Sequence, residues 1–253
     1  VCVMRNDLYK NPAFNPDLMD GMTVASDGVM TVKGTVQKLA LSVLLMFIGA
    51  AYIWAKLAAG YTDYVSMVVG ISFFAVLILG FIIIFNRRSE VIKFLVPAYA
   101  LGEGFLLGSI SCMLEQIIPG IVTQAVAGTV LATAVMLFLY YYGIIRVTER
   151  LRSVIFGAIT TIFGIYMIDI IMSFFNHSVP FIHSAGPVGI VFSIVVIGIL
   201  CFDLLLDFDF IEGMSQRLAP KHFEWYGAFG VLVTVIWLYL EILKLLAKLN
   251  SRR

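Results

Sequence analysis

Long apolar runs separated by short polar connections dominate the chain from residue 36 onward. Seven of these runs are long enough to cross a bilayer, because a helix needs roughly 20 mostly apolar residues to span the hydrocarbon core. They cover residues 36–59, 64–85, 91–114, 121–142, 154–175, 188–206 and 223–246. The connections leave no room for a soluble domain. The pattern therefore predicts an all-α polytopic membrane protein, folded as one seven-transmembrane-helix bundle.

The chain before the first apolar run is polar. It contains two Asn-Pro steps and no early apolar stretch of the kind that a signal peptide needs. We therefore predict three parts: a polar cytoplasmic N-terminal segment over residues 1–35, a seven-helix transmembrane domain over 36–249, and a short basic tail over 250–253.

Composition supports a membrane protein and excludes a nucleic-acid binder. Hydrophobic residues make up 61% of the chain and charged residues only 13%, whereas a soluble domain carries about a quarter charged residues. The formal net charge is +1, which provides no basic patch for nucleic acid. The first partner that the composition predicts is the lipid bilayer.

Basic side chains gather on alternate connections. The segments that share a side with the N-terminus carry Arg5, Lys10, Lys33, Lys38, Arg87, Arg88, Lys93, Arg146, Arg150, Arg152, Arg217 and Lys221. By the positive-inside rule, this asymmetry predicts a cytoplasmic N-terminus. Seven crossings place Lys244, Lys248, Arg252 and Arg253 on the opposite side, against the rule, and we nevertheless expect the last helix to cross fully.

Four carboxylates end the sixth apolar run: Asp203, Asp207, Asp209 and Glu212. An ionised Asp at the bilayer centre costs about 2.5–3.5 kcal/mol on insertion scales, so acids placed there usually have a function. Asp203 and Asp207 are four residues apart and share a helix face, whereas Asp209 points nearly opposite to Asp207. We expect Glu212 to face cytoplasmic water, as Asp209 also can, and keep Asp203 and Asp209 as candidates for an ion path.

Another acid, Glu103, lies mid-span in the third run, between Gly102 and Gly104 and ahead of Gly108. The glycines form a small-xxx-small face, for which we expect close packing against another helix. Glu103 is either a hydrogen-bonded acid between helices or part of an ion or proton path, and both alternatives stay open. Asp169 in the fifth run is a further candidate with less context.

Glu241 in the seventh run has two alternative partners. Lys244, three residues on, can neutralise it on the same helix face. Alternatively, Glu241 faces inward and meets Asp207 of the neighbouring helix. Two such carboxyls in a low-dielectric site cannot both ionise cheaply, so they would share a proton and form a proton-sensitive latch. The same oxygens suit Ca²⁺, which makes Asp207 and Glu241 candidate metal ligands.

Enzyme signatures are absent from the sequence. It contains no His-Glu-x-x-His zinc motif and no Gly-x-Ser-x-Gly nucleophile elbow. We therefore predict that the protein is not an enzyme and has no cofactor, with a membrane enzyme that uses the carboxylates kept as a minor alternative.

Several motifs together resemble one family. They are Leu-Asp-Phe-Asp-Phe-Ile-Glu at residues 206–212, Asn-Pro-Ala-Phe at 11–14, Met-Thr-Val at 22–24, Tyr-Ala-Leu-Gly-Glu-Gly at 99–104, and the basic pair Arg87-Arg88 after the second span. In this order, over nearly the whole chain, they resemble the bacterial Bax-inhibitor-like branch of the transmembrane Bax-inhibitor-motif (TMBIM) superfamily.

The resemblance implies a pH-sensitive calcium leak channel in a bacterial plasma membrane, with Ca²⁺ and protons as its ionic partners. In that family an acid at the end of the sixth helix pairs with one in the seventh, and these roles fall on Asp207 and Glu241. Arg87 or Arg88 would be the basic residue that bonds to the acid pair. The resemblance also allows a second class of function, a non-conducting regulator that binds another membrane protein such as a protease or translocon.

Overall fold

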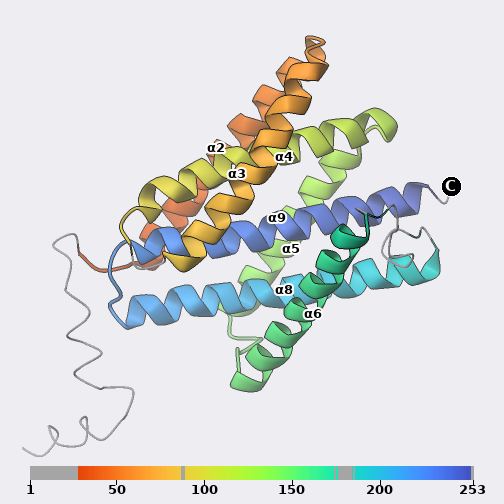
Figure 1. The fold of residues 1–253 in the computed structure, drawn as a ribbon. Coiled ribbons are helices and arrows are strands. Elements are labelled where there is room, and N and C mark those ends of the chain that lie inside the picture. The colour runs from red at the N-terminus through yellow and green to blue at the C-terminus, as the bar shows by residue number, and fades with distance from the viewer. Residues whose placement is uncertain (1–27, 87–88, 174, 176–183, 185, 252–253) are drawn as a thin grey trace, which may run out of the picture.

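Figure 1 shows the computed structural model, which describes residues 28–86, 89–173, 175, 184 and 186–251. Apart from one isolated β-bridge, the regular structure of these residues is helical, and seven of the helices are long and apolar enough to cross a membrane. They are α2 (Val32–Ala58), α3 (Thr62–Phe85), α4 (Ile92–Ile117), α5 (Ile121–Tyr141), α6 (Glu149–Ser173), α8 (Pro187–Gln216) and α9 (Phe223–Asn250). The predicted seven-span, all-α fold is confirmed.

Several helices extend beyond their predicted ends, α8 the furthest. α8 continues past residue 206 to Gln216 and has 30 residues, so it is about 45 Å long against a hydrocarbon core of about 30 Å. α8 is therefore longer than the hydrocarbon core is thick. α2 begins at Val32, inside the segment predicted to be a polar N-terminal part that precedes the first span. Residues 1–27 of that segment lie outside the described residues.

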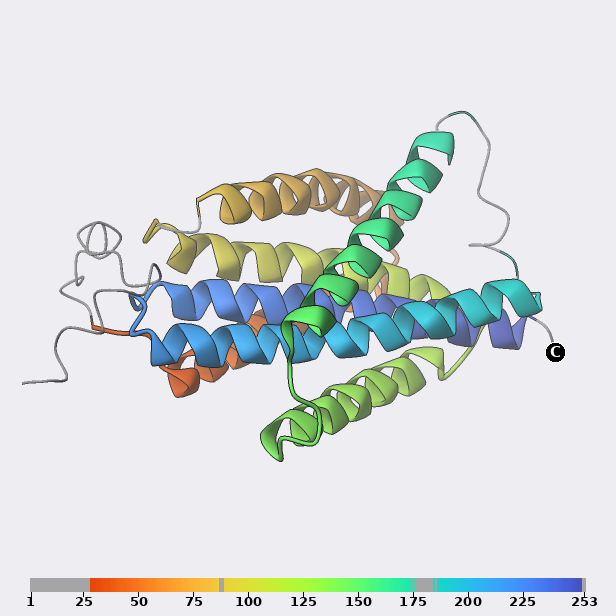
Figure 2. The ribbon, with the colours of Figure 1, turned by 90° about the horizontal axis from the view of Figure 1, so that it is seen from below.

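α9 is the central helix of the bundle. It packs against α2, α4, α5 and α8, while α3 lies on the outer side of α4 (Figures 1 and 2). α8 runs antiparallel beside α9 along most of its length, and α6 crosses α8 obliquely on the outside (Figure 2). α9 is the most buried of the seven helices and α6 the least, so the side chains of α9 and of the α8 face beside it form the interior.

Small residues bring α2 and α4 into backbone contact, as the glycines of α4 predicted. A Cβ atom at Gly108 would lie 2.7 Å from the Cα of Ala50 on α2, which leaves room only for glycine. Trp54 of α2 donates its indole N–H to the carbonyl of Gly108 over 2.9 Å. Gly102 instead faces α3, where the side chain of Val76 occupies the space that a Cβ would need.

A carboxylate also organises the tight turn between α4 and α5. Gly120 takes a left-handed conformation with φ of 85°, which glycine adopts without strain. The side chain of Glu115 then accepts hydrogen bonds from the backbone N–H groups of Gly120 at 2.6 Å and Val122 at 3.0 Å. This satisfies donors that a helix start leaves free, so Glu115 has a structural role.

Candidate functional site

Asp203 and Asp207, which we call the acid pair, lie one turn apart on α8 and face the same residue of α9. The hydroxyl oxygen of Thr234 lies 2.7 Å from Asp207 Oδ2 and 3.3 Å from Asp203 Oδ2. A Cβ atom at Gly230, one turn earlier on α9, would lie 3.2 Å from Asp207 Oδ1. Glycine at that position therefore lets the Asp207 carboxyl lie directly against the backbone of α9.

The acid pair presents more hydrogen-bond acceptors than Thr234 has hydrogens to donate. A threonine hydroxyl donates one hydrogen and accepts up to two, so Thr234 cannot donate to both carboxylates at once. One proton on Asp203 completes the chain, because the protonated carboxyl donates to Thr234, which in turn donates to Asp207. Among the ion pairs found within the described residues, none involves either acid.

Glu241 lies in a different environment, nearer the other end of α9. Its side chain is completely buried and accepts hydrogen bonds from Tyr166 of α6 at 2.7 Å and Ser193 of α8 at 2.9 Å. Lys244 completes the set with an ion pair of 3.5 Å between Nζ and Glu241 Oε2. The structure thus forms the Glu241–Lys244 contact, one of the two alternatives that the sequence leaves open.

A second lysine extends this group of residues. Lys248 Nζ donates to Ser193 Oγ at 2.8 Å and to the Gly189 carbonyl at 3.0 Å. The ammonium of Lys244 also lies 4.4 Å from the centre of the Tyr166 ring, a cation–π distance. We call Glu241, Tyr166, Ser193, Lys244 and Lys248 the Glu241 cluster. Both lysines have partners inside the protein.

The structure does not bring Asp207 and Glu241 together. Thr234 and Glu241 are two turns apart on α9, about 10 Å along the helix axis. On α8, the Glu241 partner Ser193 lies almost four turns before Asp207, about 20 Å away. The predicted contact between the two acids is therefore not formed here, and neither is a joint Ca²⁺ site. Within the described residues, no group of three or more His, Cys, Asp and Glu side chains is arranged to hold a metal ion.

The acids at the end of α8 have partners at the periphery. Asp209 forms a 2.6 Å ion pair with Arg152 of α6, in which 32% of the Asp209 and 51% of the Arg152 side chain are exposed. Glu212 accepts from Tyr140 of α5 at 2.5 Å and from Gln216 at 3.1 Å. Asp209, which we predicted as a candidate for the ion path, is therefore held apart from the acid pair, at the partly exposed edge of the bundle.

The remaining predicted residues lie apart from the acid pair. Glu103 accepts a hydrogen bond of 2.7 Å from Tyr99 on its own helix, and the Tyr99 ring packs edge-on against Phe229 of α9. Asp169 is buried on α6, one turn beyond Tyr166. Arg87 and Arg88, predicted to bond to the acids, lie outside the described residues.

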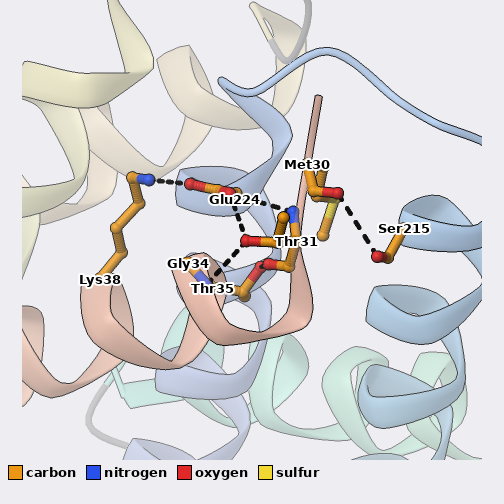
Figure 3. Close-up of polar contacts among 7 residues, drawn as sticks. All are labelled: Met30, Thr31, Gly34, Thr35, Lys38, Ser215 and Glu224. Atoms are coloured by element: carbon orange, nitrogen blue, oxygen red, sulfur yellow. Dashed lines mark hydrogen bonds and ion pairs between the residues drawn. The ribbon is translucent and has the colours of Figure 1, made fainter. Parts of the chain in front are cut away.

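Sequence reasoning missed the neutral partners and one buried acid. The neutral partners are Thr234, Tyr166 and Ser193, each a hydroxyl residue in an otherwise apolar helix. In the sequence, only this polarity distinguished them from their neighbours. Glu224, 2% exposed at the start of α9, forms an ion pair with Lys38 of α2 and accepts from Thr31 just before α2 (Figure 3). In the sequence, Glu224 was marked only by its place in the first turn of a helix, close to basic loop residues.

Comparison with protein families gives one match. A family described as Bax inhibitor 1 like matches residues 11–251, which include all seven helices, the acid pair and the Glu241 cluster. Comparisons with curated proteins and with solved structures gave no match. The family match covers nearly the whole chain and agrees with the resemblance drawn from the sequence motifs. The chain therefore belongs to the Bax inhibitor 1 like family.

Proposed function

We propose that this membrane protein is a pH-sensitive cation leak channel that conducts Ca²⁺, and that the acid pair is its proton-sensitive element. The observation that carries the proposal is the shared hydroxyl: two carboxyls of α8 compete for one Thr234 of α9. Membership of a Bax-inhibitor-like family of membrane proteins supports the same class of function.

The acid pair couples proton binding to the contact between α8 and α9. With one proton present, the chain from Asp203 through Thr234 to Asp207 holds the two helices together. When the proton leaves, two like charges face each other in a low-dielectric site, which is unfavourable. One carboxylate then also lacks a donor, because Thr234 has a single hydrogen. Separation of α8 from α9 relieves both penalties and exposes carboxylate oxygens, which are the ligands that Ca²⁺ prefers.

Glu241 takes a different role from the predicted one, while the roles of the arginines and the orientation in the membrane stay proposals. Glu241 of α9 is bonded to α6 and α8, and it holds α8 in place at that end while the part of α8 that carries the acid pair moves. Arg87 or Arg88 stays the proposed basic partner of the acids, on the strength of the family resemblance. We also propose a cytoplasmic N-terminus in a bacterial plasma membrane, because most of the described basic residues lie in the connections on the side of the bundle where α2 begins.

The test is Ca²⁺ flux into liposomes that contain the purified protein, measured between about pH 6 and pH 8, the range in which a buried carboxyl titrates. We expect flux to rise with pH in the wild type and to lose this dependence in Asp207→Asn. Asp209→Asn is the matched control, because it removes an exposed acid two residues away, and it should behave as the wild type. Flux equal to that of protein-free liposomes at every pH would refute the channel.

One observation favours the alternative, a non-conducting regulator of another membrane protein. α6 is the least buried helix and packs chiefly on α8, so most of its surface is free for lipid or a partner. Co-purification of a stable protein partner, together with no flux at any pH, would support this function over the channel.

A further inference from the structure

The four residues before α2, which we call the strap (Gly28, Val29, Met30 and Thr31), are bonded to the α8–α9 connection. The Met30 N–H donates to the Ala219 carbonyl at 2.7 Å, and the Lys221 N–H donates to the Gly28 carbonyl at 3.2 Å. Ser215 near the end of α8 donates to the Met30 carbonyl at 3.4 Å (Figure 3). The strap therefore lies across the end of the α8–α9 pair as an extended segment.

The side chain of Met30 enters the bundle from the strap. It is 1% exposed, and its Cε lies 3.5 Å from the position of a Cβ on Gly227. Ile211 of α8 and the methyl group of Thr35 of α2 reach the same position, at 3.0 and 3.2 Å. Four segments thus meet in one apolar layer over Gly227.

This apolar layer lies one turn from the acid pair. Ile211 follows Asp207 by one turn on α8, and Gly227 precedes Gly230, which touches Asp207, by about one turn on α9. Because the two helices run antiparallel, both steps lead toward the α8–α9 connection. Met30 and Ile211 therefore lie between the acid pair and the aqueous phase at that end of the bundle.

A buried clasp holds the strap in place. Thr31 donates its backbone N–H and its hydroxyl to Glu224 Oε1, each at 3.0 Å, and Lys38 bonds to the other carboxylate oxygen (Figure 3). Thr31 Oγ1 also accepts from the Gly34 N–H at 2.9 Å and so caps the start of α2. The clasp links the position of the strap to the first turns of α2 and α9.

We propose that the strap is a built-in stopper, with Met30 as its plug, which closes the acid pair from water and ions at the α8–α9 connection. Its effect on ion flux rests on the proposed channel function, whereas its cover over the acid pair does not. Release of Thr31 from Glu224 would withdraw Met30 and open a path along α8 and α9 to Asp207.

The test measures access to position 207 directly. In protein with Cys2, Cys112 and Cys201 replaced by alanine, Asp207→Cys provides a single thiol, whose reaction with a charged, water-soluble methanethiosulfonate is timed. We expect Met30→Ala to accelerate the reaction about tenfold, because truncation of the plug lowers the free energy of local opening. Ile121→Ala is the matched control, since it truncates a fully buried side chain at the start of α5, in a core cluster that does not contain Met30.

Equal rates in Met30→Ala and Ile121→Ala would overturn the stopper. Glu224→Gln is the second variant: it weakens the clasp and leaves Met30 intact, and it should also accelerate the reaction. Liposome flux of Met30→Ala separates this inference from the channel. Faster thiol reaction without flux in any variant keeps the stopper and refutes the channel, whereas flux in the wild type with an unchanged thiol reaction keeps the channel and refutes the stopper.

Discussion

The acid pair and the Glu241 cluster are two groups that place carboxyls at the contact between α8 and α9, with opposite supplies of hydrogen-bond donors. Glu241 has one carboxylate and receives bonds from two hydroxyls and an ammonium, with a second ammonium beyond Ser193. The acid pair has two carboxyls and one hydroxyl. One group is satisfied as it stands, and the other is complete only with a proton or a cation.

This difference separates structural from responsive acids. An acid within a membrane span suggests function by its position alone, and position alone placed Glu241 and Asp207 in the same class. Their partners place them in different classes, because a carboxylate that is already paired and hydrogen-bonded gains little from binding a proton. The comparison predicts that variants of Glu241 change stability and that variants of the acid pair change the response to pH.

The largest expected effect is the loss of stability in Glu241→Ala. The substitution leaves the hydroxyls of Tyr166 and Ser193 without their shared acceptor, at a cost of about 1–3 kcal/mol for each unsatisfied group, and removes the ion pair with the half-exposed Lys244. Thermal or denaturant unfolding in detergent micelles measures it. Glu241→Gln, which still accepts hydrogen bonds, should lose less. A variant Glu241→Ala as stable as the wild type would remove the distinction between the two groups.

A smaller loss is expected when the acid pair loses its only hydroxyl. Thr234→Val keeps the shape of the side chain but leaves Asp203 and Asp207 with no donor from α9, at a cost of about 1–3 kcal/mol for the unsatisfied buried groups. Thr234→Ser keeps the hydroxyl and should restore the stability. If Val and Ser variants unfold alike, the hydrogen bonds from Thr234 do not hold α8 to α9.

The clasp at the strap should contribute about 1 kcal/mol through Thr31. Thr31→Ala removes the N-cap of α2 and one of the bonds to Glu224, and loss of a helix cap typically costs this amount. Thr31→Ser retains both contacts and serves as the control. The stability of each variant in micelles, compared with the rate of thiol reaction at position 207, shows whether the clasp and the plug act together.

The smallest effect is expected for the peripheral acid. Asp209→Asn breaks the ion pair with Arg152, which is half-exposed, and exposed pairs contribute about 0–1 kcal/mol. The unfolding midpoint in micelles should barely move. A large loss of stability would show that Asp209 belongs with the buried acids and would remove it as a control.

The seven spans followed from the sequence because hydropathy over about 20 residues reports directly on bilayer crossing. The far end of α8 did not, since Asp207, Asp209 and Glu212 interrupt the hydropathy that marks a span. The helix continues there because Ile211 is buried against α9 and the strap. A local pattern cannot report a contact of this kind.

The residue contacts of the site were harder to predict than its helices. The four-residue spacing of Asp203 and Asp207 correctly placed them on one face, because that relation lies within a single helix. The pairing of Asp207 with Glu241 needed the offset between two antiparallel helices, which side-chain packing sets and no motif encodes. The strap was hidden because its contacts join residue 30 to residue 219, far away in the sequence.

The central claim is that the acid pair shares a proton at neutral pH. Infrared spectroscopy of the purified protein tests it directly, because a protonated carboxyl has a carbonyl stretching band that a carboxylate lacks. We predict that a protonated-carboxyl band at neutral pH is lost in Asp207→Asn and in Asp203→Asn and is retained in Glu241→Gln. A band of equal intensity in the wild type and in both Asp variants, or a band that weakens in Glu241→Gln, would contradict the account.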